Sequence, residues 1–154
     1  MKIEVGQNAP EFILHDTEKN EVSLADLKGN KVLLLFFPLA FTSVCTKELC
    51  NVRDNIAAYN NIKAKVFGIS VDSPQTLKKF KEDQHLNFPL LSDFNKEISA
   101  AYGCLYNTFA GWMKGVSKRS AFIIDENGLL LYTEILENAG DMPDFISINN
   151  ILAQ

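Results

Sequence analysis

Cys45 is the residue of this sequence whose type and position point most directly to chemistry. It ends the segment Pro38-Leu-Ala-Phe-Thr42-Ser-Val-Cys45, which follows an apolar run at 31–37 and leads into a helical pattern of apolar residues. Unpaired backbone N–H groups and the positive end of the helix dipole stabilise an anion at the start of a helix, and a thiolate is an anion. The spacing therefore predicts a reactive thiolate at Cys45.

A helix end alone is too weak to ionise this thiol. Bringing the pKa of a thiol from its ordinary value to below neutrality needs about 3 kcal/mol of differential stabilisation. A helix terminus typically supplies about 0.3–1 kcal/mol. A fixed cation is therefore needed as well, and Arg119, directly before the apolar run 120–125, is a candidate that folding could bring to the thiol.

The elements that must position these residues follow from periodicity and turn residues. An apolar strand at 31–37, a helix at about 44–60 and a second strand at 65–71 form a predicted βαβ unit. The rest of the chain predicts short strands at 11–14 and 88–91 and an antiparallel hairpin of 120–125 with 129–135. It also predicts a helical turn at 23–27 and helices at 74–85 (capped by Ser73), 93–101 and 142–152. A loop is expected at 106–118. This order predicts an α/β thioredoxin-like sandwich, with a central mixed sheet flanked by helices on both faces.

Pro38, Thr42 and Cys45 reproduce the Pro-x-x-x-Thr-x-x-Cys signature of the peroxiredoxins, the AhpC/TSA family, which the sequence resembles from 5–12 through 67–73 to 119–125. The resemblance implies that the Cys45 thiolate attacks a peroxide and becomes a sulfenic acid. It implies that Arg119, the Thr42 hydroxyl and the backbone N–H groups around Cys45 meet the charge on the departing oxygen. Pro38 would shield the thiolate, and Glu48 would orient Arg119.

Two of these residues also have simpler interpretations. Thr42 is a good N-cap residue and could serve only to begin the helix. Glu48 could be an acidic residue favoured near the helix start, or part of a capping box.

Cys50 is a candidate resolving cysteine. The spacing Cys45 to Cys50 resembles the bacterioferritin-comigratory subgroup, whereas the segment 36–42 resembles the AhpE-type one-cysteine subgroup, so the subgroup stays open. On an ideal helix the two cysteines lie about 140° apart around the axis and about 7.5 Å apart along it, so a disulfide requires the first turns to unwind. The alternative is a half-exposed helix cysteine without a redox role.

The remaining chemistry-bearing side chains carry no motif. Cys104 is expected to be a packed or free thiol, with resolution or interchain pairing as the alternative. His15 and His85 lie on separate segments, so no metal site is expected. A set of apolar residues could form a dimer contact or a collar near the site, or pack in the core: Phe41, Phe94, Phe109, Trp112 and Met113.

Composition limits the classes of function. The 154 residues are 47% hydrophobic, which suits one domain over 1–154 with a substantial core. A net charge of −4 with scattered basic residues predicts neither a nucleic-acid nor a membrane partner. Residues 1–8 lack the apolar stretch of a secretory signal, so a cytoplasmic location is expected, and three cysteines fit catalytic or free thiols in a reducing compartment.

The resulting prediction is a thiol peroxidase that needs no cofactor. It would reduce hydrogen peroxide and organic hydroperoxides as a monomer or homodimer and be recycled by thioredoxin or a similar dithiol. A redox sensor that passes oxidation to a partner protein is an alternative. A thioredoxin-like disulfide oxidoreductase is disfavoured because the Cys-x-x-Cys spacing of that class is missing.

Overall fold

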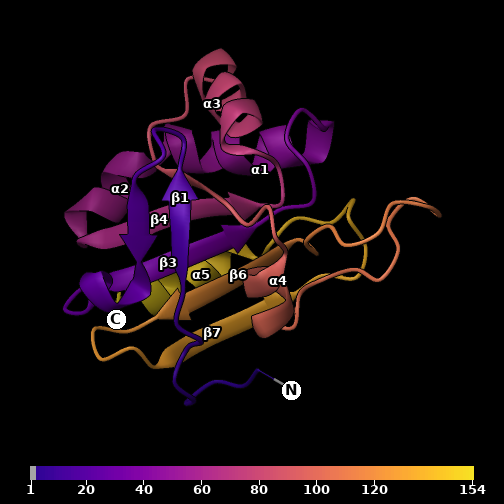
Figure 1. The fold of residues 1–154 in the computed structure, drawn as a ribbon. Helices are drawn as coiled ribbons and strands as arrows, with labels where there is room; N and C mark the ends of the chain where they lie inside the picture. Colours follow the sequence, from indigo (N-terminus) through magenta and orange to yellow (C-terminus); the bar gives the residue numbers. More distant parts are fainter. Residues whose placement is uncertain (1–2) are drawn as a thin grey trace.

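A seven-stranded mixed sheet forms the centre of the computed structural model, which describes residues 3–154 and, at Val44 and Cys45, the backbone alone (Figure 1). Met1 and Lys2, part of the segment considered for a secretory signal, lie outside the described residues. The strand order is β2-β1-β5-β4-β3-β6-β7. The strands are β1 (Ile13–Asp16), β2 (Glu21–Ser23), β3 (Lys31–Phe36), β4 (Ala64–Ser70), β5 (Leu90–Ser92), β6 (Ser120–Ile124) and β7 (Leu130–Ile135).

The central strand β3 is buried on both faces. It runs parallel to β4, which runs parallel to β5, whereas β6 pairs antiparallel with the other side of β3. Leu33 and Leu35 point into one core layer, and Leu34 and Phe36 point into the opposite layer. The uninterrupted apolar run at 32–37 is what such a doubly covered strand requires.

Helices cover both faces, as predicted. On one face lie α1 (Ser43–Asp54), α2 (Ile56–Asn61), α3 (Pro74–Asp83) and α5 (Phe145–Leu152), which contribute Leu49, Leu77 and Ile148 to one core layer. The other face is covered by the N-terminal segment, the 3-10 turn η1 (Leu24–Leu27) and α4 (Glu97–Ala101), with Tyr102 filling the second layer. Figure 1 shows α4 in front of the sheet and α5 behind it.

The single helix predicted at 44–60 is wrong, because Asn55 divides it into α1 and α2. Asn55 has φ −115° and ψ 15°, outside helical geometry, and its side-chain amide donates a hydrogen bond to the Asn51 carbonyl at 2.7 Å. Asparagine side chains compete with backbone N–H groups for such carbonyls, which favours a helix end. Apolar periodicity carries no signal for this break.

Two other helices begin later than predicted, for a similar reason. Before α4, the Asp93 carboxylate accepts hydrogen bonds from the N–H groups of Ile98 (3.2 Å) and Ser99 (2.7 Å), so 93–96 form a turn instead of a helix. Before α5, Asp144 is the N-cap and accepts from the Ser147 N–H at 3.1 Å. In contrast, the predicted Ser73 cap of α3 and the 120–135 hairpin are both present.

Residues 104–118 form an extended arm between α4 and β6, which includes the loop predicted at 106–118. The arm folds back on itself through isolated bridges that pair Leu105 with Ser117 and Phe109 with Met113. It projects away from the sheet in Figure 1. Within the described residues, no helix has the length and apolar character needed to cross a bilayer.

Candidate active site

The loop at 37–42 connects the carboxyl end of β3 to α1 and carries two of the predicted site residues. Pro38 is buried where the strand ends, and Thr42 occupies the N-cap position of α1 with φ −97° and ψ 150°. The Thr42 hydroxyl donates to the Leu39 carbonyl at 3.1 Å, and no cap bond to its side chain occurs in the described part of the chain. Thr42 therefore begins the helix by position, while its hydroxyl is directed back into the loop.

Cys45 lies in the first turn of α1, as predicted. Its side chain and that of Val44 lie outside what the structure describes. The chemistry of the site is therefore built from the groups that surround this turn.

Glu48 and Arg119 form a buried ion pair one helical turn beyond Cys45. Arg119 Nη1 lies 2.5 Å from Glu48 Oε2, and both side chains are at most 2% exposed. The pair spans 71 positions in the sequence. The antiparallel register of β3 with β6, which sets Phe36 opposite Ser120, brings Arg119 beside the end of β3 where the loop and α1 begin.

A backbone carbonyl holds the other side of the guanidinium. Ala139 O accepts hydrogen bonds from Arg119 Nε at 3.3 Å and Nη2 at 3.1 Å. Ala139 belongs to the loop after β7, which the arm keeps in place: Lys118 Nζ pairs with Glu137 at 2.8 Å, and the Tyr106 hydroxyl donates to the Glu137 carbonyl at 2.8 Å. The planar guanidinium is thus fixed on two sides.

Burial raises the pKa of the Glu48 carboxyl to about 7, while the charge and hydrogen bond of Arg119 oppose this rise. The carboxylate of Glu134 on β7 adds to the upward shift. Among the described residues, Glu48 Oε1 has no hydrogen-bond partner. An incompletely satisfied buried carboxyl of this kind changes its charge near neutral pH, which is unusual for a glutamate.

The other two cysteines differ in their surroundings. Cys50, in the middle of α1, is half-buried, and its sulfur lies 3.8 Å from Gln84 Oε1. Cys104 is fully buried, and burial raises the pKa of its thiol to about 12, so it stays protonated at neutral pH. Both are free thiols, as expected for Cys104.

Comparison with known proteins identifies the family of this chain. Residues 5–133 match the AhpC/TSA family. The chain belongs to this family. It is 42% identical over 132 residues to a putative peroxiredoxin of Coxiella burnetii, and the match covers 84% of this chain and 87% of that protein. It is 37% identical over 145 residues to alkyl hydroperoxide reductase E of Mycobacterium tuberculosis, covering 92% and 91%.

A solved structure agrees with this assignment. The peroxidoxin BcpB of Mycobacterium tuberculosis superposes with a TM-score of 0.83 at 30% identity, covering 98% of this chain and 95% of that one. The predicted thioredoxin-like fold and peroxiredoxin family are therefore confirmed, and the protein is a thiol-dependent peroxidase. The Coxiella relative is named bcp and the mycobacterial one alkyl hydroperoxide reductase E, so relatives named for each of the two subgroups resemble this chain. The subgroup therefore stays open.

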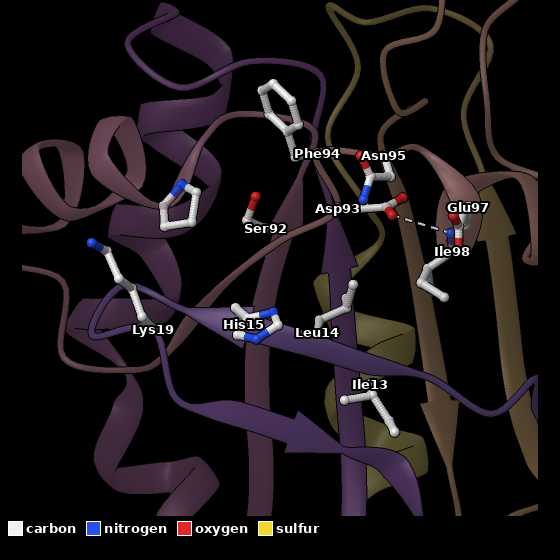
Figure 2. Close-up of a pocket in the computed structure, with 11 residues that line it drawn as sticks. Ile13, Leu14, His15, Lys19, Ser92, Asp93, Phe94, Asn95, Glu97 and Ile98 are labelled. Atoms are coloured by element: carbon white, nitrogen blue, oxygen red, sulfur yellow. Dashed lines mark hydrogen bonds between the residues drawn. The ribbon is translucent and has the colours of Figure 1, made fainter.

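A cavity of about 580 Å³ in this peroxiredoxin lies away from the Glu48–Arg119 pair (Figure 2). It is bounded by β1, β5 and the turn before α4, whereas the ion pair lies beside β3 and β6. One of its two acidic residues, Asp93, is already bonded to the N–H groups of α4, as the dashed line to Ile98 shows, and Ser92 Oγ donates to the Asp72 carbonyl. The bonds of Asp93 and Ser92 therefore serve the fold.

The five apolar residues considered for a dimer contact, a collar or the core differ in their exposure: Phe109 and Met113 are half-buried, and the other three are exposed. Core packing is wrong for Phe41, Phe94 and Trp112, which are 52%, 62% and 74% exposed. The Phe41 ring contacts the Phe80 ring at 5.1 Å, and Trp112 lies at the bend of the arm. A dimer contact through Phe41 and Trp112 stays a prediction.

Ala139 and Glu134 contribute to the site but were missed in the sequence. A backbone carbonyl can come from any residue type, so Ala139 has no sequence signal. Glu134 lies near the end of a predicted strand, after Thr133, and a glutamate at such a position carries no signal that distinguishes it from an ordinary solvent-facing residue.

Proposed function

We propose that Cys45 is the peroxidatic nucleophile of this enzyme. Its thiolate attacks one oxygen of a hydroperoxide, so that an S–O bond forms while the O–O bond breaks. The sulfur is oxidised to a sulfenic acid, and the departing oxygen takes up a proton and leaves as water or an alcohol. The observation that supports this proposal is the buried Glu48–Arg119 pair, because Glu48 belongs to α1 and follows Cys45 by three residues.

Arg119, Thr42 and the first N–H groups of α1 then supply the donors for the departing oxygen. Glu48 and the Ala139 carbonyl orient the guanidinium without contacting the substrate. The Thr42 hydroxyl donates a hydrogen bond to Leu39 O in this structure. The hydroxyl must therefore rotate about the Cα–Cβ bond before it can donate to the peroxide. Pro38 is buried at the strand end and limits access of water to the loop.

The substrates that fit this chemistry are hydrogen peroxide and organic hydroperoxides. The name of one relative, alkyl hydroperoxide reductase E, supports the second class. The reaction on a cysteine needs no metal, haem or flavin. The location in the cytoplasm and the choice between monomer and homodimer stay predictions.

The sulfenic acid must then be reduced by a thiol, which forms a disulfide and releases water. Cys50 is the internal candidate, and thioredoxin or a similar dithiol would reduce the resulting disulfide. Since Glu48 lies between the two cysteines, unwinding α1 enough for them to meet also breaks the Glu48–Arg119 pair. If Cys50 is only structural, an external thiol resolves Cys45 instead.

Peroxide turnover with a dithiol donor tests the proposal. Cys45→Ser should abolish turnover, while Cys104→Ser, which changes a buried thiol away from α1, should retain most of it. Cys50→Ser should leave the first reaction with peroxide intact and slow only the recycling. Retained turnover in Cys45→Ser would refute the assignment, and mixed disulfides of Cys50→Ser with partner proteins would favour the redox sensor.

A further inference from the structure

The loop at 37–42 is fixed by contacts from two elements outside it. The backbone N–H of Ala40 donates to Asp72 Oδ2 at 2.8 Å. The next residue, Phe41, sets its ring edge-on against Phe80 of α3, with centroids 5.1 Å apart and an interplanar angle of 65°. Both contacts come immediately before Thr42.

Asp72 is itself held rigidly at the carboxyl edge of the sheet. Ser70, the last residue of β4, donates its hydroxyl to the same Oδ2 at 2.7 Å and accepts from the Asp72 N–H at 3.2 Å. Ser92 Oγ donates to the Asp72 carbonyl at 2.6 Å. Because β4 runs parallel to β3, with Phe36 opposite Ile69, this fixed carboxylate lies where the loop leaves β3.

The loop needs such contacts because Phe41 has φ 67°, in the left-handed region. For a non-glycine residue this conformation costs about 1–2 kcal/mol and persists only where the surroundings enforce it. Without the bond to Ala40, Phe41 is free to relax to a negative φ. That change would redirect Thr42 and the first turn of α1.

We infer that Asp72 is a positioning residue for peroxide reduction. Its carboxylate holds Ala40, and through Phe41 it sets the backbone position of Thr42 and of the first N–H groups of α1, which are the proposed donors to the peroxide. Asp72 does not touch the reacting atoms. This inference rests on the proposed roles of Cys45 and Thr42.

The test compares two reactions of Cys45 in proteins that carry Cys50→Ser. Peroxide attack needs the positioned donors, whereas alkylation by iodoacetamide above the thiol pKa needs only an accessible thiolate. Asp72→Ala should lower the second-order rate constant for hydrogen peroxide about ten- to a hundredfold and leave the alkylation rate within about twofold. Asp72→Asn keeps an acceptor oxygen for the Ala40 N–H and should stay within about threefold of the parent.

Asp93→Ala is the matched control. Asp93 follows β5 at the same edge of the sheet, but its carboxylate binds the N–H groups of Ile98 and Ser99 instead of the loop. This variant should lose stability and retain the peroxide rate. If Asp72→Ala does not fold, Ser70→Ala removes the second hydrogen bond to Asp72 Oδ2 and should slow peroxide attack about two- to fivefold.

Three results would overturn the inference: an unchanged peroxide rate in the folded variant, equal losses for Asp72→Ala and Asp72→Asn, or equal losses of peroxide and alkylation rates. Equal losses in Ala and Asn would assign the effect to the charge of Asp72. A parent protein whose peroxide reaction does not depend on Cys45 would instead refute the proposed function.

Discussion

Glu48 couples the described part of the site to pH through its ionisation state. Burial raises the pKa of its carboxyl in the folded state from 4.5 to about 7. Between these values the folded protein retains a proton that the unfolded chain has released, so a rise in pH favours unfolding. The stabilisation present below about pH 4.5 is therefore lost as the pH approaches 7.

This coupling predicts a pH-dependent difference between the wild type and Glu48→Gln. The free energy of unfolding of the wild type, relative to that of the variant, should fall by roughly 3 kcal/mol between pH 4.5 and 7.5. Urea unfolding at a series of pH values measures this difference. A Glu48→Gln difference that stays constant over this pH range would contradict a raised pKa.

Arg119 depends on its shape as well as its charge. One planar guanidinium contacts Glu48 and the Ala139 carbonyl together, which a lysine ammonium cannot reproduce. Arg119→Ala should raise the pKa of the Cys45 thiol and slow peroxide attack about 10²–10³-fold. Arg119→Lys should keep the thiol pKa near that of the wild type and still slow attack about tenfold or more.

Stopped-flow kinetics with hydrogen peroxide and the pH dependence of thiol alkylation separate these two effects. Equal rates for wild type and Arg119→Lys would show that charge alone is sufficient. An unchanged thiol pKa in Arg119→Ala would show that another cation ionises Cys45.

At the scale of elements, α1 has two functions that conflict. In the proposed mechanism its first turn stabilises the Cys45 thiolate, while resolution by Cys50 would require that turn and the next to open. Oxidation by one equivalent of hydrogen peroxide should therefore increase amide hydrogen exchange in residues 46–50 of the wild type and leave α3 protected. Cys50→Ser should keep α1 protected after oxidation. Unchanged exchange in the wild type would indicate a one-cysteine mechanism.

The sequence predicts most elements because their signals are local. The apolar run of β3, the Ser73 cap of α3 and the Asn127-Gly128 turn each require a particular structure from a few neighbouring residues. The break at Asn55 was not predicted because it depends on a side chain that competes for a backbone carbonyl. The helical spacing of apolar residues continues across Asn55, so this spacing does not reveal the break.

The site residues show the same difference between local sequence signals and contacts made between distant elements. Glu48 and Arg119 could be paired through a family signature, although 71 positions separate them. Asp72 could be interpreted only as part of a helix start, because its bond to Ala40 depends on the parallel register of β3 and β4. Contacts between elements of this kind become visible only in three dimensions.

At the scale of the whole molecule, we propose that residues 1–154 unfold as one domain. Cys104 reports on this directly, because it is fully buried between the sheet and the N-terminal segment. Its alkylation should be negligible in the native protein and should increase along the same urea transition as the loss of secondary structure. Alkylation well before that transition would indicate a separately unfolding unit.

The central claim is that Cys45 is the thiol that peroxide oxidises. Its most direct test is the intact mass of the reduced wild type and of Cys45→Ser after one equivalent of hydrogen peroxide. The wild type should lose two hydrogens if Cys50 resolves the sulfenic acid, or gain one oxygen if it does not, and Cys45→Ser should keep its mass. An unchanged wild-type mass, or the same change in Cys45→Ser, would contradict the account.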